Sequence, residues 1–219
     1  YTDAENFRKK GANAVCITNG FDREAKIEAK IETKSFTLSY VGVLEQLRNP
    51  EVLWKVLNDI IAENPDFKND FELKFVGRVD DKILKEIENS NLKDSLNNVG
   101  YLSHLEANAE MQSSDVLLMT NFPHESSKGI IPGKIFEYLA TGKPILSFGP
   151  KESDVKKILD ETNAGKHFSY QDSAELKAFL IDHYQNWKSG ITSSKTKNIE
   201  QFSRRNLTGK LSEILEAET

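Results

Sequence analysis

The stretch GIIPGKIFEYLATGKPIL, residues 129–146, carries residue types whose spacing suits anion binding. It predicts a short helix with Lys134 in its first turn, where the helix dipole is positive and an acidic residue is preferred. Gly129 and Gly133 leave the backbone before this helix uncovered, and free amides at a helix start bind phosphates and similar anions. Lys134 would add a full positive charge, so we expect an anion here, and a diphosphate suits the chemistry.

Glu137 follows one turn later and could bind neutral hydroxyls. At about 100° per residue, Lys134, Glu137, Tyr138 and Thr141 fall on one face of the predicted helix. The opposite face is apolar and comprises Ile135, Phe136, Leu139 and Ala140. A carboxylate on the outward face can accept hydrogen bonds from hydroxyls such as those of a ribose.

An ordinary surface ion pair is the alternative interpretation of Lys134 and Glu137. Residues three apart on a helix often form a solvated pair that contributes a few tenths of a kcal/mol. Lysine ahead of glutamate is the poorer orientation for such a pair, and a glycine-rich approach is unusual for a plain surface turn. Spacing alone leaves both interpretations open.

The rest of the chain predicts elements that would position these residues. Short runs of β-branched and aromatic residues alternate with segments of helical periodicity, which is typical of βαβ units and a parallel sheet. The predicted strands are residues 14–18, 36–41, 72–76, 96–99, 115–119, 144–148 and 166–169. The predicted helices are residues 50–64, 80–88, 104–113, 132–141, 153–162 and 173–187, and two further helices are expected after residue 189.

Several residues are expected to begin or end these helices. Asn49 is predicted to cap the helix that starts at Pro50, and Gly142 is predicted to end the helix over residues 132–141 in a left-handed conformation. Asp80 and Asp81 form a carboxylate pair that could hold a metal ion. A helix start at Asp80 is the better explanation of that pair.

Loops at the carboxyl ends of the strands are the expected ligand-binding segments, because ligands of open parallel sheets bind there. The first such loop carries Gly42 and Arg48, and the second carries Gly77 and Arg78. A third loop spans residues 99–104. The loop over residues 120–134 is long for a connection between a strand and a helix, and such length is more often functional than accidental.

Composition and single residues exclude several classes of protein. A net charge of −5 with no long block of either sign argues against a nucleic-acid-binding surface. The four histidines are scattered without paired spacing, which argues against a zinc site, and Cys16 is expected to pack in a strand. No P-loop, nucleophile elbow or dinucleotide fingerprint is present. No signal peptide or membrane-spanning run is evident, so a cytoplasmic location is expected.

At this point the stretch over residues 129–146 resembles the signature of retaining glycosyltransferases of GT-B architecture, in particular family 4. The resemblance extends to AVCITNGFD at residues 14–22, YVGVLEQLRNPEVL at 40–53, FELKFVGR at 71–78, VGYLSHLEANAEMQSSDVLLM at 99–119 and IEQFSRRNLTGKLSEIL at 199–215. It covers nearly the whole chain in the family's order. It implies a Rossmann-like three-layer α/β/α domain with a mostly parallel sheet, the carboxy-terminal half of a GT-B fold, plus C-terminal helices.

The resemblance also implies roles for individual residues. Lys134, Arg48 and Glu137 would be the catalytic residues, with Lys134 and Arg48 on the diphosphate and Glu137 on the ribose. The amides of Gly133 and Lys134 would assist at the helix start. The further donor-binding residues would be Gly42, Arg78, Gly100, Tyr101, Leu102, Leu105, Gly129, Ile130, Ile131, Pro132 and Ile135.

One position departs from the family pattern. Many members carry a second glutamate eight residues before the ribose-binding one, close to the donor sugar, and this chain has Gly129 there. Glu125 or the amides of the loop are the candidates for replacing that carboxylate. No metal ion or other cofactor is implied, because Lys134, Arg48 and the helix amides would stabilise the leaving diphosphate themselves.

The implied domain organisation places an acceptor-binding domain outside this chain. Residues 1–22 would end that domain, residues 23–189 would bind the nucleotide sugar, and residues 190–219 would pack back on the acceptor domain. The isolated chain is then expected to be inactive, and any contact with a membrane would be peripheral and through the missing domain. A sugar-nucleotide epimerase of similar architecture and a non-catalytic nucleotide-binding module stay open as alternatives.

Overall fold

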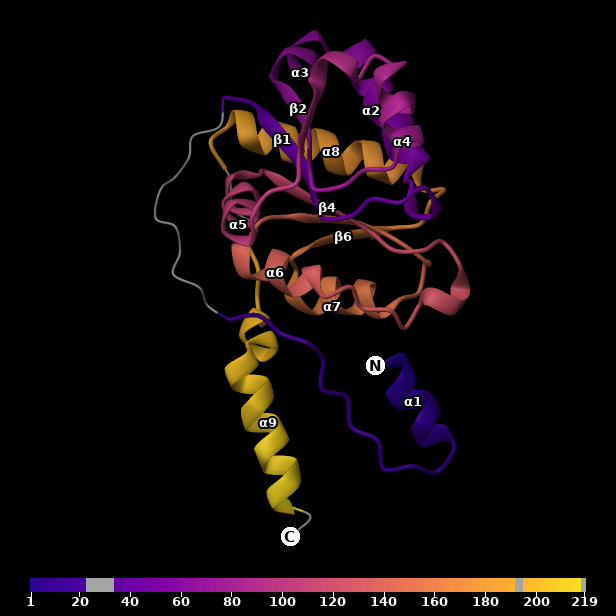
Figure 1. Cartoon of the computed structure of the whole chain (residues 1–219), viewed down its shortest axis with the longest axis vertical. Helices are drawn as coiled ribbons and strands as arrows, with labels where there is room; N and C mark the ends of the chain where they lie inside the picture. The colour runs from indigo at the N-terminus through magenta and orange to yellow at the C-terminus, as the bar shows by residue number, and fades with distance from the viewer. Residues whose placement is uncertain (23–33, 192–194, 218–219) are drawn as a thin grey trace.

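The central element of the computed structural model, which describes residues 1–22, 34–191 and 195–217, is a parallel six-stranded sheet (Figure 1). Its strands are β1 (Phe36–Val41), β2 (Phe71–Val76), β3 (Leu96–Gly100), β4 (Val116–Thr120), β5 (Ile145–Phe148) and β6 (Gly165–Phe168). All neighbouring strands run parallel, in the order β3-β2-β1-β4-β5-β6. The predicted α/β fold is confirmed.

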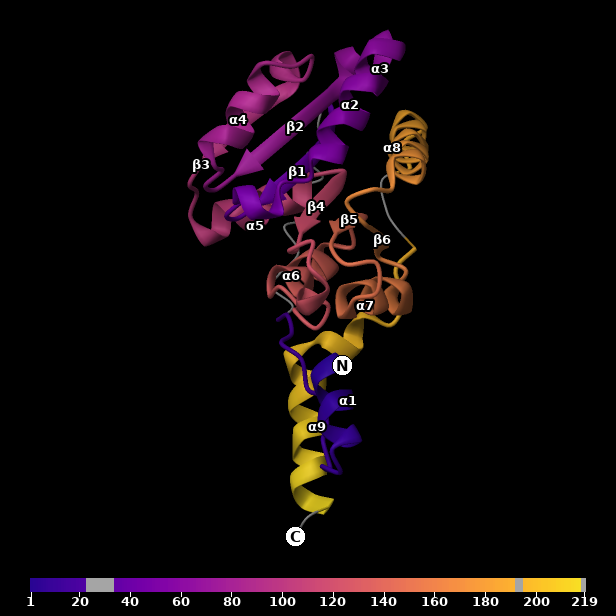
Figure 2. The same cartoon turned by 90° about the vertical axis from the view of Figure 1, so that its right-hand side faces the viewer.

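Helices cover both faces of the sheet (Figures 1 and 2). One face carries α2 (Glu51–Glu63), α3 (Pro65–Asp70), α4 (Asp81–Glu88) and α8 (Ser173–Lys188), and the other carries α5 (His104–Ser113), α6 (Lys134–Thr141) and α7 (Asp154–Thr162). The 3-10 turns are η1 (Gln46–Arg48), η2 (Lys93–Ser95), η3 (Glu125–Ser127) and η4 (Ile199–Phe202). Helices α1 (Thr2–Lys9) and α9 (Arg204–Ala217) flank the domain.

The two faces of the sheet differ in character. Phe36, Leu38 and Tyr40 of β1 point to the large core under α2 and α8, whereas Thr37 and Ser39 point to the side of α5. This alternation follows from the two-residue period of a strand. On the second face the apolar core lies beneath α6 and α7, and its strand residues are Leu117, Met119 and Ile145.

The sheet order fixes where a crevice opens. Strands β2 and β3 are added on one side of β1. The chain then crosses to the other side of β1, where β4, β5 and β6 follow in order. β1 and β4 are paired only from Leu38 to Tyr40, against residues 116–118. The loops after β1 and β4 therefore leave in opposite directions, and the crevice beyond such a reversal is the usual ligand site of this architecture.

The predicted strand over residues 14–18 is wrong. This segment has no regular secondary structure and joins no ladder in the described part of the chain, and Val15 and Ile17 are exposed. Phe21, which lies beyond this segment, makes an isolated bridge to Ser203. Strand-forming residues need a neighbouring strand to satisfy their backbone groups, and the six-stranded sheet does not reach this segment.

The predicted helix ends at Gly142 and Asp80 agree with the structure, whereas the one at Asn49 does not. Gly142 is left-handed (φ 69°) and Asp80 caps α4 by accepting a hydrogen bond from the Lys82 amide at 2.9 Å, as predicted. The predicted Asn49 cap is wrong, because the Asn49 side chain instead accepts a hydrogen bond from the Trp54 indole at 2.6 Å. Helix α3 was not predicted, and it begins where the Asn64 side chain accepts a hydrogen bond from the Phe67 amide.

The terminal segments extend away from the sheet. In both ribbon views α9 projects from the α6–α7 side, with α1 on the same side (Figures 1 and 2). Of the two helices predicted after residue 189, one is the short η4 and the other is α9. The proposed domain boundary at residue 23 lies outside the described residues. Within the described ranges, we find no helix long and apolar enough to span a membrane.

Candidate functional site

Lys134 reaches the carboxyl end of β1, next to the point where the strand order reverses. Its ammonium donates a hydrogen bond to the Val41 carbonyl at 2.8 Å and lies 4.0 Å from the centre of the Tyr40 ring. The side chain is half-buried, because it crosses from the start of α6 to the carboxyl end of β1. The positive charge is therefore held at the point where the strand order reverses.

Glycines make room for this charge. A Cβ atom added to Gly42 would lie 2.9 Å from the Lys134 ammonium nitrogen, and Gly42 has φ 121°. Gly77, with φ 114°, packs so closely that an added Cβ would collide with the Gly42 carbonyl oxygen. Residues other than glycine rarely adopt these backbone conformations. The loops after β1 and β2 thus keep bare backbone beside the ammonium group.

Glu137 lies on the neighbouring side of α6 and does not pair with Lys134. Its carboxylate is 3.8 Å from Nε2 of His104, the first residue of α5, and both side chains are at least half exposed. Lys134 is bound to Val41 instead. In the part of the chain described, the ion pair of the alternative interpretation is therefore not formed, and Lys134 does not lie on a freely exposed face as the helix angles predict.

Tyr138 and Ala140 also differ from the prediction. Ala140 is exposed, whereas Tyr138 is fully buried, with its hydroxyl 3.1 Å from the Val41 amide and 3.2 Å from the Leu118 carbonyl. Burial raises the pKa of the Tyr138 phenol. The helix covers the sheet where β1 and β4 end, so the side that faces these strand ends is enclosed. The angles alone could not reveal that two strand ends flank this helix.

Arg48 lies in the loop after β1, and its side chain is bound by other residues of the same loop. Its guanidinium group contacts Glu45 at 3.0 Å and the Val43 carbonyl at 3.1 Å, and it lies 5.3 Å from the Phe122 ring centre. The side chain is only 18% exposed, and its Nε is buried with no hydrogen-bond partner among the described atoms. Arg78 is exposed on the next loop. No described contact joins either arginine to Lys134.

The third predicted segment, residues 99–104, is largely exposed. Gly100 ends β3 with φ 80°, and Tyr101 and Leu105 are 92% and 70% exposed. Leu102 is half-buried. Ser103 then begins α5 with a capping box in which its side chain and that of Glu106 satisfy each other's backbone amides. This arrangement presents backbone groups and apolar side chains beside His104 and Glu137.

The long loop before α6 is braced from beneath. The buried Asn121 donates to the Ile130 carbonyl at 3.0 Å, and the Ser127 hydroxyl contacts two carbonyls of its own loop at 2.7 Å. The Asp154 amide donates to the Lys128 carbonyl at 2.8 Å. Ile130 is exposed, and Ile131 and Pro132 are half-buried. Asn121 and Ser127 were not predicted, since their partners are visible only in the folded loop.

The donor-binding role of Ile135 stays a prediction. Its side chain is fully buried in the core beneath α6, and its amide donates to the Pro132 carbonyl. The amides of Gly133 and Lys134, by contrast, make no hydrogen bond within the described part of the chain. The helix start therefore offers two free donors and one cation.

Gly129 lies against the N-terminal segment. A Cβ atom added there would lie 3.3 Å from the Thr2 Cβ and 3.6 Å from an Asp3 carboxylate oxygen. Both Asp3 and Gly129 line a cavity of ≈ 390 Å³ between residues 14–19 and the start of α6. Glu125 is exposed in η3. Asp3 is thus a carboxylate near Gly129 that the sequence could not indicate, because the two residues are far apart in the chain.

These features suit the binding of a phosphorylated ligand by positive charge and backbone amides. The described ranges contain no cluster of three His, Cys, Asp or Glu side chains that could hold a metal ion. A family profile described as glycosyl transferases group 1 matches residues 35–186. The chain belongs to this glycosyltransferase family. A search of curated proteins found no match.

Solved glycosyltransferase structures share the fold. HepE from Anabaena, in complex with UDP, matches with a TM-score of 0.62 and 16% identity, over 84% of this chain and 49% of that one. A TarM mutant from S. aureus, in complex with fondaparinux, α-GlcNAc-glycerol and UDP, matches with a TM-score of 0.63 and 16% identity, over 92% and 38%. A glycosyltransferase from Rickettsia africae matches with a TM-score of 0.66 and 14% identity, over 91% and 56%.

This glycosyltransferase chain therefore spans about half the length of the first of these relatives, 49% for HepE. Its α/β domain corresponds to one half of a GT-B fold, as the resemblance implies. The identities are low, so the likeness establishes the fold alone.

Proposed function

We propose that this glycosyltransferase domain binds a uridine diphosphate sugar and provides the donor half of a retaining transfer reaction. The observation that carries the proposal is Lys134, whose charge lies at the reversal of strand order beside bare glycine backbone. Phosphate groups bind at such helix starts. The UDP complexes of HepE and TarM support the choice of nucleotide.

In this proposal the diphosphate binds the free amides of Gly133 and Lys134 and the Lys134 ammonium group. Glu137 accepts hydrogen bonds from the ribose hydroxyls, which requires that it exchange its contact with His104 for the ligand. The base lies along the loop at Gly100–Leu102. Arg48 becomes a second phosphate contact when its guanidinium leaves Glu45.

The reaction needs stabilisation of the charge that grows on the leaving diphosphate. A fixed cation and fixed amides supply this without reorganisation, and removing one such group typically costs about 10²–10³ in rate. We propose that no divalent metal is required. The transferred sugar would lie toward Gly129, where Asp3 offers the nearest described carboxylate for its hydroxyls.

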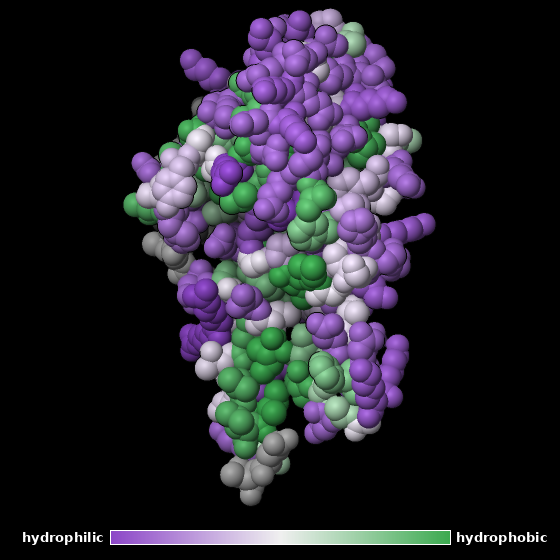
Figure 3. Space-filling view, turned by 45° about the vertical axis from the view of Figure 1, so that its right-hand side comes forward, coloured by the Kyte–Doolittle hydropathy of each residue, from purple (hydrophilic) through white to green (hydrophobic). Residues whose placement is uncertain are grey.

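The acceptor site is proposed to belong to a second domain that packs on the terminal segments. Figure 3 shows apolar side chains gathered on the end of the molecule that carries α9. Exposed residues from α1, the segment after it and α9 contribute, namely Phe7, Val15, Ile17, Leu211 and Leu215. An apolar surface of this kind usually marks an interface. The chain alone would then bind the donor without transferring the sugar.

Calorimetric titration with nucleoside diphosphates tests this function. We expect UDP to bind more tightly than GDP or ADP, with an affinity that a chelator does not change. Glu137→Ala should weaken the binding of UDP about tenfold, which corresponds to about 1.4 kcal/mol. The binding of 2′,3′-dideoxy-UDP should not change, since only the ribose hydroxyls reach the carboxylate. Glu88→Ala, at an exposed carboxylate on α4, is the matched control.

Two results would contradict the proposal. A wild-type chain that binds none of the nucleotides at millimolar concentration would show that the site does not bind a nucleotide. Alternatively, UDP binding that depends on added Mg²⁺ would refute the metal-independent part alone.

A further inference from the structure

Helix α5 is attached to the sheet mainly by polar side chains. Met111 is its only fully buried residue among those described, and the strand residues that face it, Thr37 and Ser39 of β1 and Lys74 of β2, are polar. Most helices that cover a sheet are held by an apolar stripe. The position of α5 must therefore depend on specific polar contacts.

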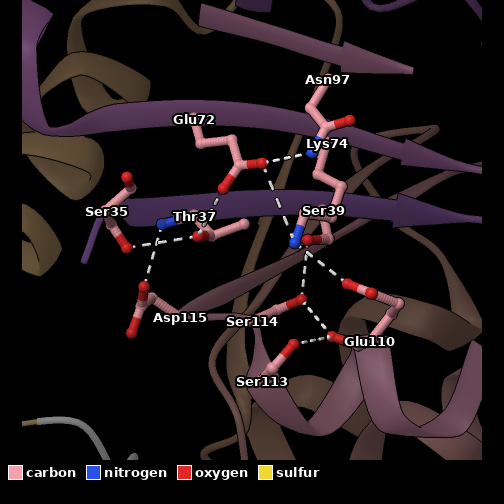
Figure 4. Close-up of polar contacts among 10 residues, drawn as sticks. All are labelled: Ser35, Thr37, Ser39, Glu72, Lys74, Asn97, Glu110, Ser113, Ser114 and Asp115. Atoms are coloured by element: carbon pink, nitrogen blue, oxygen red, sulfur yellow. Dashed lines mark hydrogen bonds and ion pairs between the residues drawn. The ribbon is translucent and has the colours of Figure 1, made fainter. Parts of the chain in front are cut away.

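Lys74 makes the central contact of this polar layer (Figure 4). Its ammonium group lies 3.0 Å from a carboxylate oxygen of Glu110 on α5 and 3.9 Å from one of Glu72 on its own strand. The Lys74 side chain is only 12% exposed, whereas those of Glu72 and Glu110 are 25% and 29% exposed. A mostly buried ammonium group between two carboxylates is costly to leave unpaired, so it fixes Glu110.

Two further bonds hold the end of the same helix (Figure 4). Ser114, just after α5, places its hydroxyl 2.7 Å from that of Ser39, and both residues are fully buried. The next residue, Asp115, accepts a hydrogen bond from the Thr37 amide at 2.9 Å. These contacts join the carboxyl end of α5 to β1, so the ion pair at Glu110 acts on a helix that is already fixed at one end.

The other end of α5 belongs to the candidate site. The loop from Gly100 to Leu102 leads into the helix, and His104 and Leu105 form its first turn. His104 also contacts Glu137 of α6. A tilt of α5 would move both the loop proposed to contact the base and His104, the contact of Glu137. Lys134 and the start of α6 would stay fixed on β1.

We infer that the Lys74–Glu110 ion pair positions the nucleoside half of the donor site through α5. This inference rests on the proposed function. The two residues do not touch the ligand; they are positioning residues that set where the base and ribose are held. Without Lys74, the carboxylates of Glu72 and Glu110 lose their shared cation and repel each other, and α5 tilts outward about its fixed carboxyl end.

Separate titrations with uridine, UDP and pyrophosphate on the full chain test this inference. Lys74→Met keeps the volume of the side chain and removes its charge. We expect uridine and UDP to bind about tenfold more weakly, a loss of about 1.4 kcal/mol, and pyrophosphate to bind as it does to the wild type. Lys74→Arg should restore wild-type affinity within about twofold, since it keeps a cation that can pair with Glu110.

Lys177→Met is the matched control. It removes an ion pair of 2.6 Å with Glu63 between α8 and α2, on the opposite face of the sheet, and should change none of the three affinities. If Lys74→Met does not fold, Glu110→Gln removes the same pair from the helix side and gives the same expected result. Thermal unfolding shows that each variant used is folded.

The inference is overturned if folded Lys74→Met and Glu110→Gln bind uridine as tightly as the wild type. It is also overturned if uridine and pyrophosphate weaken equally, because that indicates a general loss of structure. A wild-type chain that binds neither UDP nor uridine refutes the proposed function itself, and the positioning role with it; this failure shows before any variant is made.

Discussion

Lys134 occupies a position that the helix dipole disfavours, and its contacts explain why lysine stands there. The side chain extends away from its own helix, and its ammonium group contacts the Val41 carbonyl and the Tyr40 ring. Tyr138, one turn later, binds the amide of the same Val41. Both side chains thus fix the carboxyl end of β1, and the charge of Lys134 is placed by the strand rather than by its own helix.

Gly42 tests this arrangement at the scale of one residue. Gly42→Ala introduces a methyl group where φ is 121° and where the Lys134 nitrogen is 2.9 Å away. The backbone strain should destabilise the domain by about 1–3 kcal/mol. The displaced ammonium group should also weaken UDP binding about five- to tenfold, measured by calorimetry at a temperature where the variant is folded.

Gly190→Ala separates these two effects. Gly190 also has a positive φ, 75°, but nothing lies within 4 Å of an added Cβ atom. It should therefore lower stability without changing UDP affinity. If both alanine variants weaken UDP equally, the close approach of Gly42 to Lys134 has no part in binding.

At the scale of elements, the half-buried His167 adds side-chain contacts to the ladder that joins the carboxyl ends of β5 and β6. His167 of β6 lies with Nε2 2.9 Å from the Pro150 carbonyl and Nδ1 3.1 Å from the Ser147 hydroxyl of β5. Ser153, the cap of α7, lies 3.3 Å from the same Nε2. A neutral ring satisfies these partners by donating to Pro150 and accepting from Ser147.

Burial lowers the pKa of His167, with a smaller effect in the same direction from Lys156, while the Pro150 contact opposes it. Because the pKa in the folded state lies below the unfolded value of about 6.5, the stability that His167 contributes is present above pH 6.5 and lost as the pH falls. We expect the unfolding free energy to decrease between pH 7 and pH 5, measured by denaturant titration.

His167→Gln removes the titration while keeping a donor for Pro150. Its stability should be lower than that of the wild type at pH 7 and should fall less between pH 7 and pH 5. His124→Gln changes an exposed histidine and should preserve the pH dependence of the wild type. An unchanged slope in His167→Gln would show that other groups cause the acid sensitivity.

At the scale of the whole molecule, α9 carries exposed apolar side chains, among them Leu211 and Leu215. Leu211 is 45% exposed on a helix that projects from the sheet (Figure 2). We expect Leu211→Glu to reduce self-association of the chain at high concentration, measured by sedimentation velocity, with UDP affinity unchanged. Thr208→Glu adds the same charge at an exposed polar position of α9 and should have a smaller effect.

The sheet and its helices were largely predictable because periodicity and turn residues act locally. The strands at residues 36–41 and 144–148 and the Gly142 helix end follow from such local signals. The strand expected over residues 14–18 did not form, since a strand depends on a partner elsewhere in the chain. The same holds for Asn49, whose bond to Trp54 replaces the expected cap.

The residue types of the candidate site could be picked out from the sequence, but their arrangement in space could not. The residue types at Gly133, Lys134 and Glu137 indicated an anion and a hydroxyl partner. Which strand end Lys134 reaches, the burial of Tyr138 and the Glu45 contact of Arg48 depend on the order of the strands and the loops around them. These are long-range facts that spacing in a sequence does not carry.

The most direct test of the account is the affinity of the Lys134→Met variant for UDP and uridine, measured by NMR titration alongside Lys128→Met, which changes an exposed lysine of the preceding loop. The account predicts that Lys134→Met binds UDP at least tenfold more weakly, about 1.4 kcal/mol or more, while uridine binds as before and Lys128→Met binds both like the wild type. UDP affinity equal to that of the wild type in folded Lys134→Met would contradict the assignment of the diphosphate to the start of α6.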